Sequence, residues 1–141
     1  MQAMEISRTG LDVEWRRLEV IAQNLANVST VRDAYGQTYR ALRLITGPRA
    51  DFAAHLAGRE QSAALAGVTV FGVEPAGGAP RRVHEPQNPQ ADADGYVTYA
   101  AVDQAAEMAL MVKTARAYEA NIAAMGAARQ MYTKALELGK R

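Results

Sequence analysis

The stretch NPQADADGYV places aspartates and a glycine at the spacing that comes nearest to a chemical site. A calcium loop between two helices needs oxygen ligands at positions 1, 3 and 5, glycine at 6 and glutamate at 12. The early positions hold Gln90, Asp92 and Asp94 when Gly95 is set at position 6. Position 12 is then Ala101, which cannot bind calcium. We therefore predict a turn in which Gly95 adopts a positive φ and an aspartate bonds nearby backbone N–H groups.

Other residue types that do chemistry lack the neighbours they need. His55 and His84 are isolated, the chain has no cysteine, and no HExxH spacing occurs, so no zinc site is expected. The glycine-rich EPAGGAP lacks the Lys-Ser or Lys-Thr of a phosphate loop, and no serine lies in a GxSxG context. We expect no catalytic residue, metal, cofactor or small-molecule substrate. One alternative is an enzyme that uses His84 and the aspartates of the turn.

Composition excludes some classes of partner. Sixteen basic and fifteen acidic residues among 141 give a net charge of +1, so no overall field draws the chain to nucleic acid. A hydrophobic content of 49% favours one folded domain. Charges run through the first twenty residues, so the sequence predicts neither a secretory signal peptide nor a membrane-spanning segment.

Apolar residues recur at helical spacing near the start of the chain. Asn27, Ser29 and Thr30 break this periodicity, so we predict a helix within residues 1–30. The apolar stripe of this helix consists of Met4, Leu11, Trp15, Leu18, Ile21, Leu25 and Val28.

A second, longer helix is predicted over residues 104–138. Asp103 is a suitable N-cap, and Glu107 favours the first turn. At 1.5 Å per residue the helix is about 52 Å long, which is too long for a compact globule of this chain length. Its apolar stripe consists of Met108, Met111, Ala115, Tyr118, Ile122, Met125, Tyr132 and Leu136.

Neither helix can keep an apolar stripe in water alone. We predict that the two helices pair as a parallel or antiparallel coiled coil and leave part of each stripe for neighbouring molecules. Asn24, Asn27 and Asn121 lie in or beside these stripes. They are either solvated, cap-like residues or buried polar groups that fix the register and the choice of partner.

Short stretches with strand character fill the middle of the chain, so the predicted fold class is α+β with a small β-rich segment. The candidate strands are 39–45, 68–73, 81–85 and 95–100, and 47–67 is expected to be a loop. The predicted organisation is an N-terminal core helix in 1–30, a β-rich and loop segment in 31–102, and a C-terminal core helix in 103–141.

Several motifs resemble those of the bacterial flagellar rod proteins, and specifically the C-type subunits of the proximal rod. They are TGLDVEWRRLEVIAQNLANVST, GQTYRA, EPQNPQADADGYVTY, EMALMVKTARAYEANIAAM and KALELG. The chain departs from the family pattern at Thr9, Ser29, Ala100-Ala101 and Gly126, which affects the expected neighbour contacts at those positions.

The resemblance implies a structural subunit whose terminal helices form the inner layer of a tubular rod that transmits torque from motor to hook. It implies partners among copies of the chain, other rod proteins and the flagellar type III export apparatus. It also implies export without a cleaved signal peptide and a place in the periplasmic rod of the basal body. The residues of the two helical stripes other than Met4, together with Asn24, Asn27 and Asn121, are the expected interhelix and assembly contacts. The alternative is a non-enzymatic adaptor in which the helices close into a bundle and bind one partner.

Overall fold

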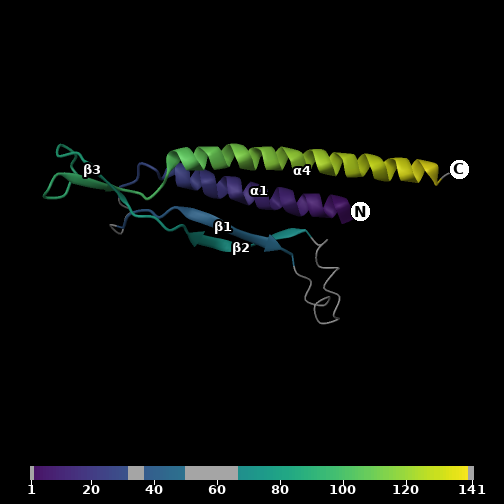
Figure 1. Ribbon diagram of the computed structural model, residues 1–141, viewed down its shortest axis with the longest axis horizontal. Coiled ribbons are helices and arrows are strands. Elements are labelled where there is room, and N and C mark those ends of the chain that lie inside the picture. The colour runs from purple at the N-terminus through teal and green to yellow at the C-terminus, as the bar shows by residue number, and fades with distance from the viewer. Residues whose placement is uncertain (1, 32–36, 50–66, 140–141) are drawn as a thin grey trace, which may run out of the picture. The chain divides into compact units, whose positions relative to one another are not determined.

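The computed structural model describes residues 2–31, 37–49 and 67–139. Long helices lie at the two ends of this part of the chain, and short strands lie between them (Figure 1). The α+β prediction is therefore confirmed. The elements in chain order are α1 (Gln2–Ala26), β1 (Leu42–Pro48), β2 (Val68–Pro75), β3 (Arg81–His84), β4 (Tyr96–Tyr99) and α4 (Gln104–Leu138).

The start of α4 and the end of α1 lie where the sequence predicts them. Asp103 caps α4, because its Oδ1 accepts a hydrogen bond from the Ala106 N–H at 3.0 Å. α1 ends at Ala26, and the chain then turns through Asn27 and Thr30 with a backbone hydrogen bond of 3.1 Å between them. Neither helix has a stretch that is long and apolar enough to cross a membrane, and no other helix lies within the described ranges.

The strands form two separate pairs. β1 pairs with β2, and β3 pairs with β4 in an antiparallel register that sets Arg81 opposite Tyr99. Three of the four strands lie close to their predicted positions. β1 begins three residues later than predicted, because Arg40 forms an isolated bridge to Ala101 and the Ala41 carbonyl accepts from the Ala76 N–H.

The prediction of a loop over 47–67 is wrong at its first residues, because β1 extends to Pro48. Residues 50–66, including His55, lie outside the described residues.

The prediction of a turn in the Asp-Ala-Asp-Gly stretch is confirmed. The Asp92 carboxylate accepts hydrogen bonds from the N–H groups of Asp94 at 3.0 Å and Tyr96 at 2.8 Å. Gly95 has a φ of 79°, and a Cβ at this residue would lie 3.1 Å from Pro86 Cβ. Glycine is therefore required both by the backbone conformation and by the close packing.

The described residues divide into two compact units, and each unit takes part of α1 and part of α4. One unit lies within residues 1–17, 44–72 and 113–141, and the other comprises 18–43 and 73–112. The buried apolar side chains are few in each. They are Val13 and Leu44 in the first unit, and Ile21, Ala41, Val97 and Ala100 in the second. Cores of this size give little stability alone.

Candidate assembly interface

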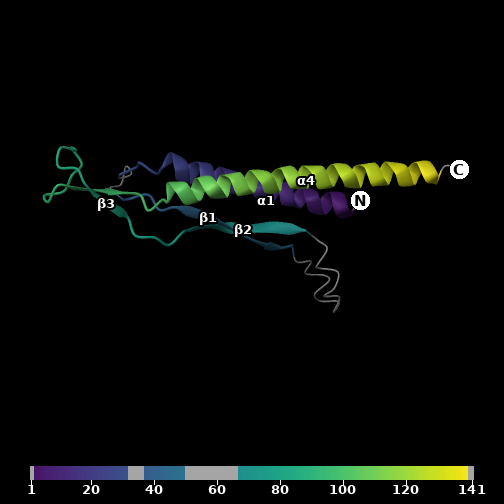
Figure 2. The same ribbon diagram turned by 45° about the horizontal axis from the view of Figure 1, so that its top comes forward.

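α1 and α4 lie side by side in the first unit and run antiparallel (Figures 1 and 2). The Trp15 ring lies 6.4 Å from the Tyr118 ring at a tilt of 50°. One turn earlier in α1, Gly10 faces Asn121. The residue number in α1 falls from 15 to 10 as that in α4 rises from 118 to 121, so the helices are antiparallel. The sequence had left both the parallel and the antiparallel arrangement open.

Gly10 lets the two helices approach closely. A Cβ at Gly10 would lie 2.8 Å from Asn121 Oδ1, which is shorter than real Cβ contacts allow. The Asn121 side chain is held in place because its Nδ2 donates to the Ala117 carbonyl at 3.0 Å. Glycine in the middle of a helix costs about 1 kcal/mol relative to alanine, and this contact explains why it is tolerated here.

The C-terminal turns of α4 extend beyond α1. With Gly10 opposite Asn121 and the same rise in both helices, Gln2 falls opposite about residue 129. α4 continues to Leu138, and both views show its yellow end running past the start of α1. All described side chains from 129 onward are exposed.

A second face of α1 packs against the sheet of β1 and β2. Thr9 connects them, because its Oγ1 accepts from the Val68 N–H at 3.1 Å and donates to the Ile6 carbonyl at 2.7 Å. Thr9 and Val13 are both buried. Sequence reasoning missed this face, although Ile6, Thr9 and Val13 have the spacing of one helical side.

In the second unit, Asn24 is the centre of a buried hydrogen-bond network. Its Oδ1 accepts from the Tyr39 hydroxyl at 2.9 Å and the Leu42 N–H at 2.8 Å. Its Nδ2 donates to the Leu42 carbonyl at 2.8 Å and to Glu107 Oε1 at 2.9 Å. Asn24 is 1% exposed, and all four of its hydrogen-bonding positions are used. One side chain therefore joins α1, the first residue of β1, Tyr39 before it and the first turn of α4.

Glu107 is the acidic residue of this network. Its Oε2 is buried and has no hydrogen-bond partner among the described residues. Burial, and secondarily the charge of Glu107, raise the pKa of the Tyr39 hydroxyl. Tyr39 therefore stays protonated and donates to Asn24 at neutral pH.

The other two asparagines bond locally. Asn27 donates to the Gln23 carbonyl at 2.8 Å and accepts from the Thr30 hydroxyl at 3.2 Å, so it is cap-like as one interpretation held. Asn121 bonds within α4, beside Gly10.

The expected contact residues differ widely in exposure. Ile21 and Asn24 are buried. The half-buried ones are Leu11, Leu18, Leu25, Asn27, Val28, Met111, Ala115, Tyr118, Asn121 and Met125. The exposed ones are Trp15, Met108, Ile122, Tyr132 and Leu136. Thr9, Val13, Ser7 and Thr114 are buried and were not expected. Whether the expected set makes contacts between molecules remains a prediction.

Much of the apolar surface of α4 has no cover within the described chain. Its exposed large side chains are Met108, Leu110, Val112, Ile122, Met131, Tyr132, Leu136 and Leu138. Exposed apolar surface of this extent along one helix is typical of a site of association with another protein.

No group of three or more His, Cys, Asp or Glu side chains within residues 2–31, 37–49 and 67–139 could hold a metal ion.

Comparison with known proteins identifies relatives over almost the full length. A family described as "Flagellar basal body rod FlgEFG protein C-terminal" matches residues 93–138, which include α4. The chain is 34% identical to the flagellar basal-body rod protein FlgC of Escherichia coli O6:H1, over 99% of the chain and 98% of the relative. It is 32% identical to FlgC of Bacillus subtilis strain 168, over 98% of the chain and 97% of that relative.

Proposed function

The chain belongs to the FlgC family of flagellar basal-body rod proteins and is a structural subunit of the rod, and from this we propose that α1 and α4 carry its assembly. The partners are copies of the chain and other rod proteins. The observation that supports this proposal is the set of exposed apolar side chains on α4, which continues past the start of α1. Burying such side chains contributes about 1.5–3 kcal/mol each, which favours an assembled state over a dilute monomer.

The mechanical role follows from the kind of contact. Identical subunits can bind one another through two different surfaces. When the rotation from one subunit to the next does not close a ring, such contacts build an open helical assembly. Many such contacts in parallel resist twisting. We place the subunit in the proximal rod, in the periplasm, where it transmits torque from the motor toward the hook and catalyses no reaction. Delivery by the flagellar type III export apparatus belongs to the same proposal.

Truncation of α4 tests the proposal. A chain that stops after Ala128 keeps the Gly10–Asn121 and Trp15–Tyr118 contacts but loses the exposed end of the helix. Expressed in a strain without the full-length gene, it should remain soluble and fail to restore swimming or rods in purified basal bodies. The full-length chain restores both. Full motility with the truncated chain would contradict assembly through α4.

Sedimentation of the purified chain, together with the protein content of purified basal bodies, distinguishes the rod subunit from the adaptor alternative. An adaptor with a closed helix bundle stays a defined monomer or dimer at every concentration and is absent from purified basal bodies. The proposed rod subunit is present in basal bodies in several copies.

A further inference from the structure

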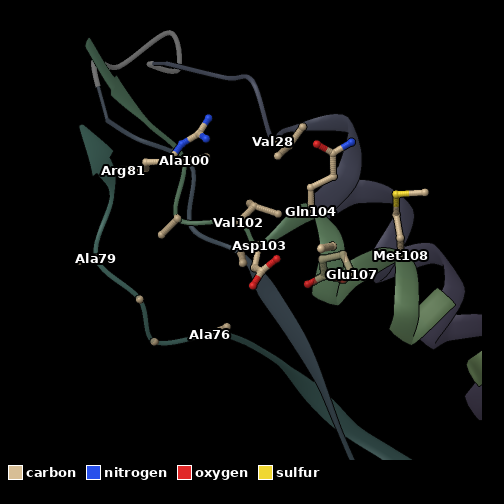
Figure 3. A pocket seen from close by; sticks show the side chains of 15 residues that line it. Val28, Ala76, Ala79, Arg81, Ala100, Val102, Asp103, Gln104, Glu107 and Met108 are labelled. Atoms are coloured by element: carbon tan, nitrogen blue, oxygen red, sulfur yellow. The ribbon is translucent and has the colours of Figure 1, made fainter. Parts of the chain in front are cut away.

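An open groove of about 820 Å³ lies in the second unit beside the start of α4 (Figure 3). Its walls are residues 76–79, residues 100–103 and the first turns of α4. Alanine and glycine make up most of the lining, so the groove has room for large side chains. Val28, Val102 and Met108 offer apolar contact.

The described lining of the groove has more acidic than basic residues. Asp103 and Glu107 line it, and Glu107 has a buried Oε2 without a hydrogen-bond partner in the described chain. Arg81 is the one basic residue among the described residues of the lining, and its guanidinium lies 5.5 Å from the Tyr99 ring centre. Figure 3 shows the Arg81 side chain apart from both carboxylates. Two acidic residues against one basic residue in the described lining make the groove suited to a partner that brings a positive charge.

The uncovered end of α4 has a positive charge and apolar side chains, which complement the acidic and apolar residues of the groove. Tyr118 and Asn121 face α1, and helical spacing continues that face through Met125, Arg129 and Tyr132. The Arg129 side chain is exposed, and its guanidinium makes no ion pair or hydrogen bond with another described residue, whereas its backbone carbonyl accepts from the Thr133 hydroxyl at 3.0 Å. It therefore presents a guanidinium between apolar side chains, level with the start of α1.

We propose that the groove of one molecule receives the C-terminal turns of α4 from a second copy, with Arg129 of that copy beside Asp103 and Glu107. The inference rests on the proposed role as a rod subunit and names one of its contacts. The two surfaces differ, so each molecule offers a groove at one place and a helix end at another. Such a contact can repeat from copy to copy without closing.

Cysteine cross-linking tests the contact directly, because the chain has no cysteine of its own. Ala79→Cys places a thiol at the exposed rim of the groove, and Thr133→Cys places one a turn beyond Arg129. Cells that depend on the double variant for swimming are oxidised mildly, and their basal bodies are separated by size. We expect dimers and higher multiples of the chain. The matched pair Ala22→Cys with Thr133→Cys, which uses an exposed residue of α1, should give at least about tenfold less.

The contribution of the Arg129 charge is tested in the variant that carries Ala79→Cys and Thr133→Cys. Arg129→Gln should reduce the dimer by about tenfold. Lys113→Gln, which removes an exposed cation elsewhere on α4, should leave it unchanged.

Motility separates failure of this inference from failure of the proposed function. Motile cells whose Ala79 and Thr133 thiols give no dimer would overturn the groove contact and leave the rod role standing. An adduct with a protein of different mass would overturn the choice of a second copy. Full motility of cells that lack the chain would instead overturn the proposed function.

Discussion

At the scale of single residues, the polar side chains within the helical stripes distinguish structural from solvated positions. Asn24 satisfies four hydrogen bonds while 1% exposed, whereas Asn27 bonds only to its own helix and the following turn. The sequence could place both asparagines near the apolar stripe. It could not rank them, because the partners of Asn24 come from Tyr39, Leu42 and Glu107, which are distant in the chain.

Replacement of Asn24 measures the network. Asn24→Ala leaves the Leu42 backbone, the Tyr39 hydroxyl and the Glu107 carboxylate without their partner. Because each buried polar group left unpaired costs about 1–3 kcal/mol, we expect the free energy of unfolding in urea to fall by about 2–4 kcal/mol. Asn27→Ala should cost less than about 1 kcal/mol. Equal losses in the two variants would mean that the network contributes nothing.

Two glycines provide a matched test of helix packing. Gly126→Ala adds a Cβ with nothing within 4 Å, so better helix propensity should stabilise the protein by about 1 kcal/mol. Gly10→Ala adds a Cβ that meets Asn121, so its gain should be lost or reversed.

Urea unfolding of both glycine variants gives the comparison, and Asn121→Ala serves as the control. Combined with Gly10→Ala, it removes the clash and should restore the gain. A similar stabilisation from Gly10→Ala and Gly126→Ala alone would contradict the close approach of α1 and α4.

At the scale of elements, local patterns predict most of what is observed. The bounds of α4 follow from a cap and a periodic stripe, and the turn at Gly95 follows from two aspartates and a glycine. The face of α1 that packs on the sheet was missed. Its defining hydrogen bond joins Thr9 to Val68, which are 59 residues apart, and no local pattern reports a contact at that separation.

The hairpin of β3 and β4 should lose stability in acid. The hydrogen bond from Asn88 and then that from Tyr99 lower the pKa of Glu85 below 4.5, and the Tyr96 N–H is the main cause of a pKa of Asp92 below 3.8. A lowered folded pKa gives stability that is present above the ordinary pKa and is lost as pH falls through the folded value. Amide exchange in the hairpin should therefore rise relative to the helices as the pH falls below the ordinary pKa values of these two carboxyls.

Carbon NMR titration of the side-chain carboxyls checks the cause. Asp92→Asn should remove part of the pH dependence of amide exchange in the hairpin. Asp94→Asn should not, because the Asp94 carboxylate on the same turn accepts no hydrogen bond from another described residue, whereas the Asp92 carboxylate does. A titration midpoint for Asp92 at or above 3.8 would contradict the hydrogen-bonded turn.

At the scale of the whole molecule, many large apolar side chains lie on the surface rather than in a buried core. Few side chains are fully buried, while those along α4 remain exposed, from Met108 to Leu138. The sequence predicted this excess from the length of the second helix and its stripe. It could not specify which neighbour covers which turn, because that depends on surfaces of other molecules.

Hydrogen exchange of α4, in the free chain and in purified basal bodies, tests the central claim most directly. In the dilute monomer, amides from residue 130 to Leu138 should exchange as in an unfolded peptide, because α1 does not reach them. Amides near Tyr118 should exchange more slowly. In basal bodies, we expect the C-terminal turns to be protected by at least about a hundredfold. Equal exchange in the two states would contradict a rod that covers α4.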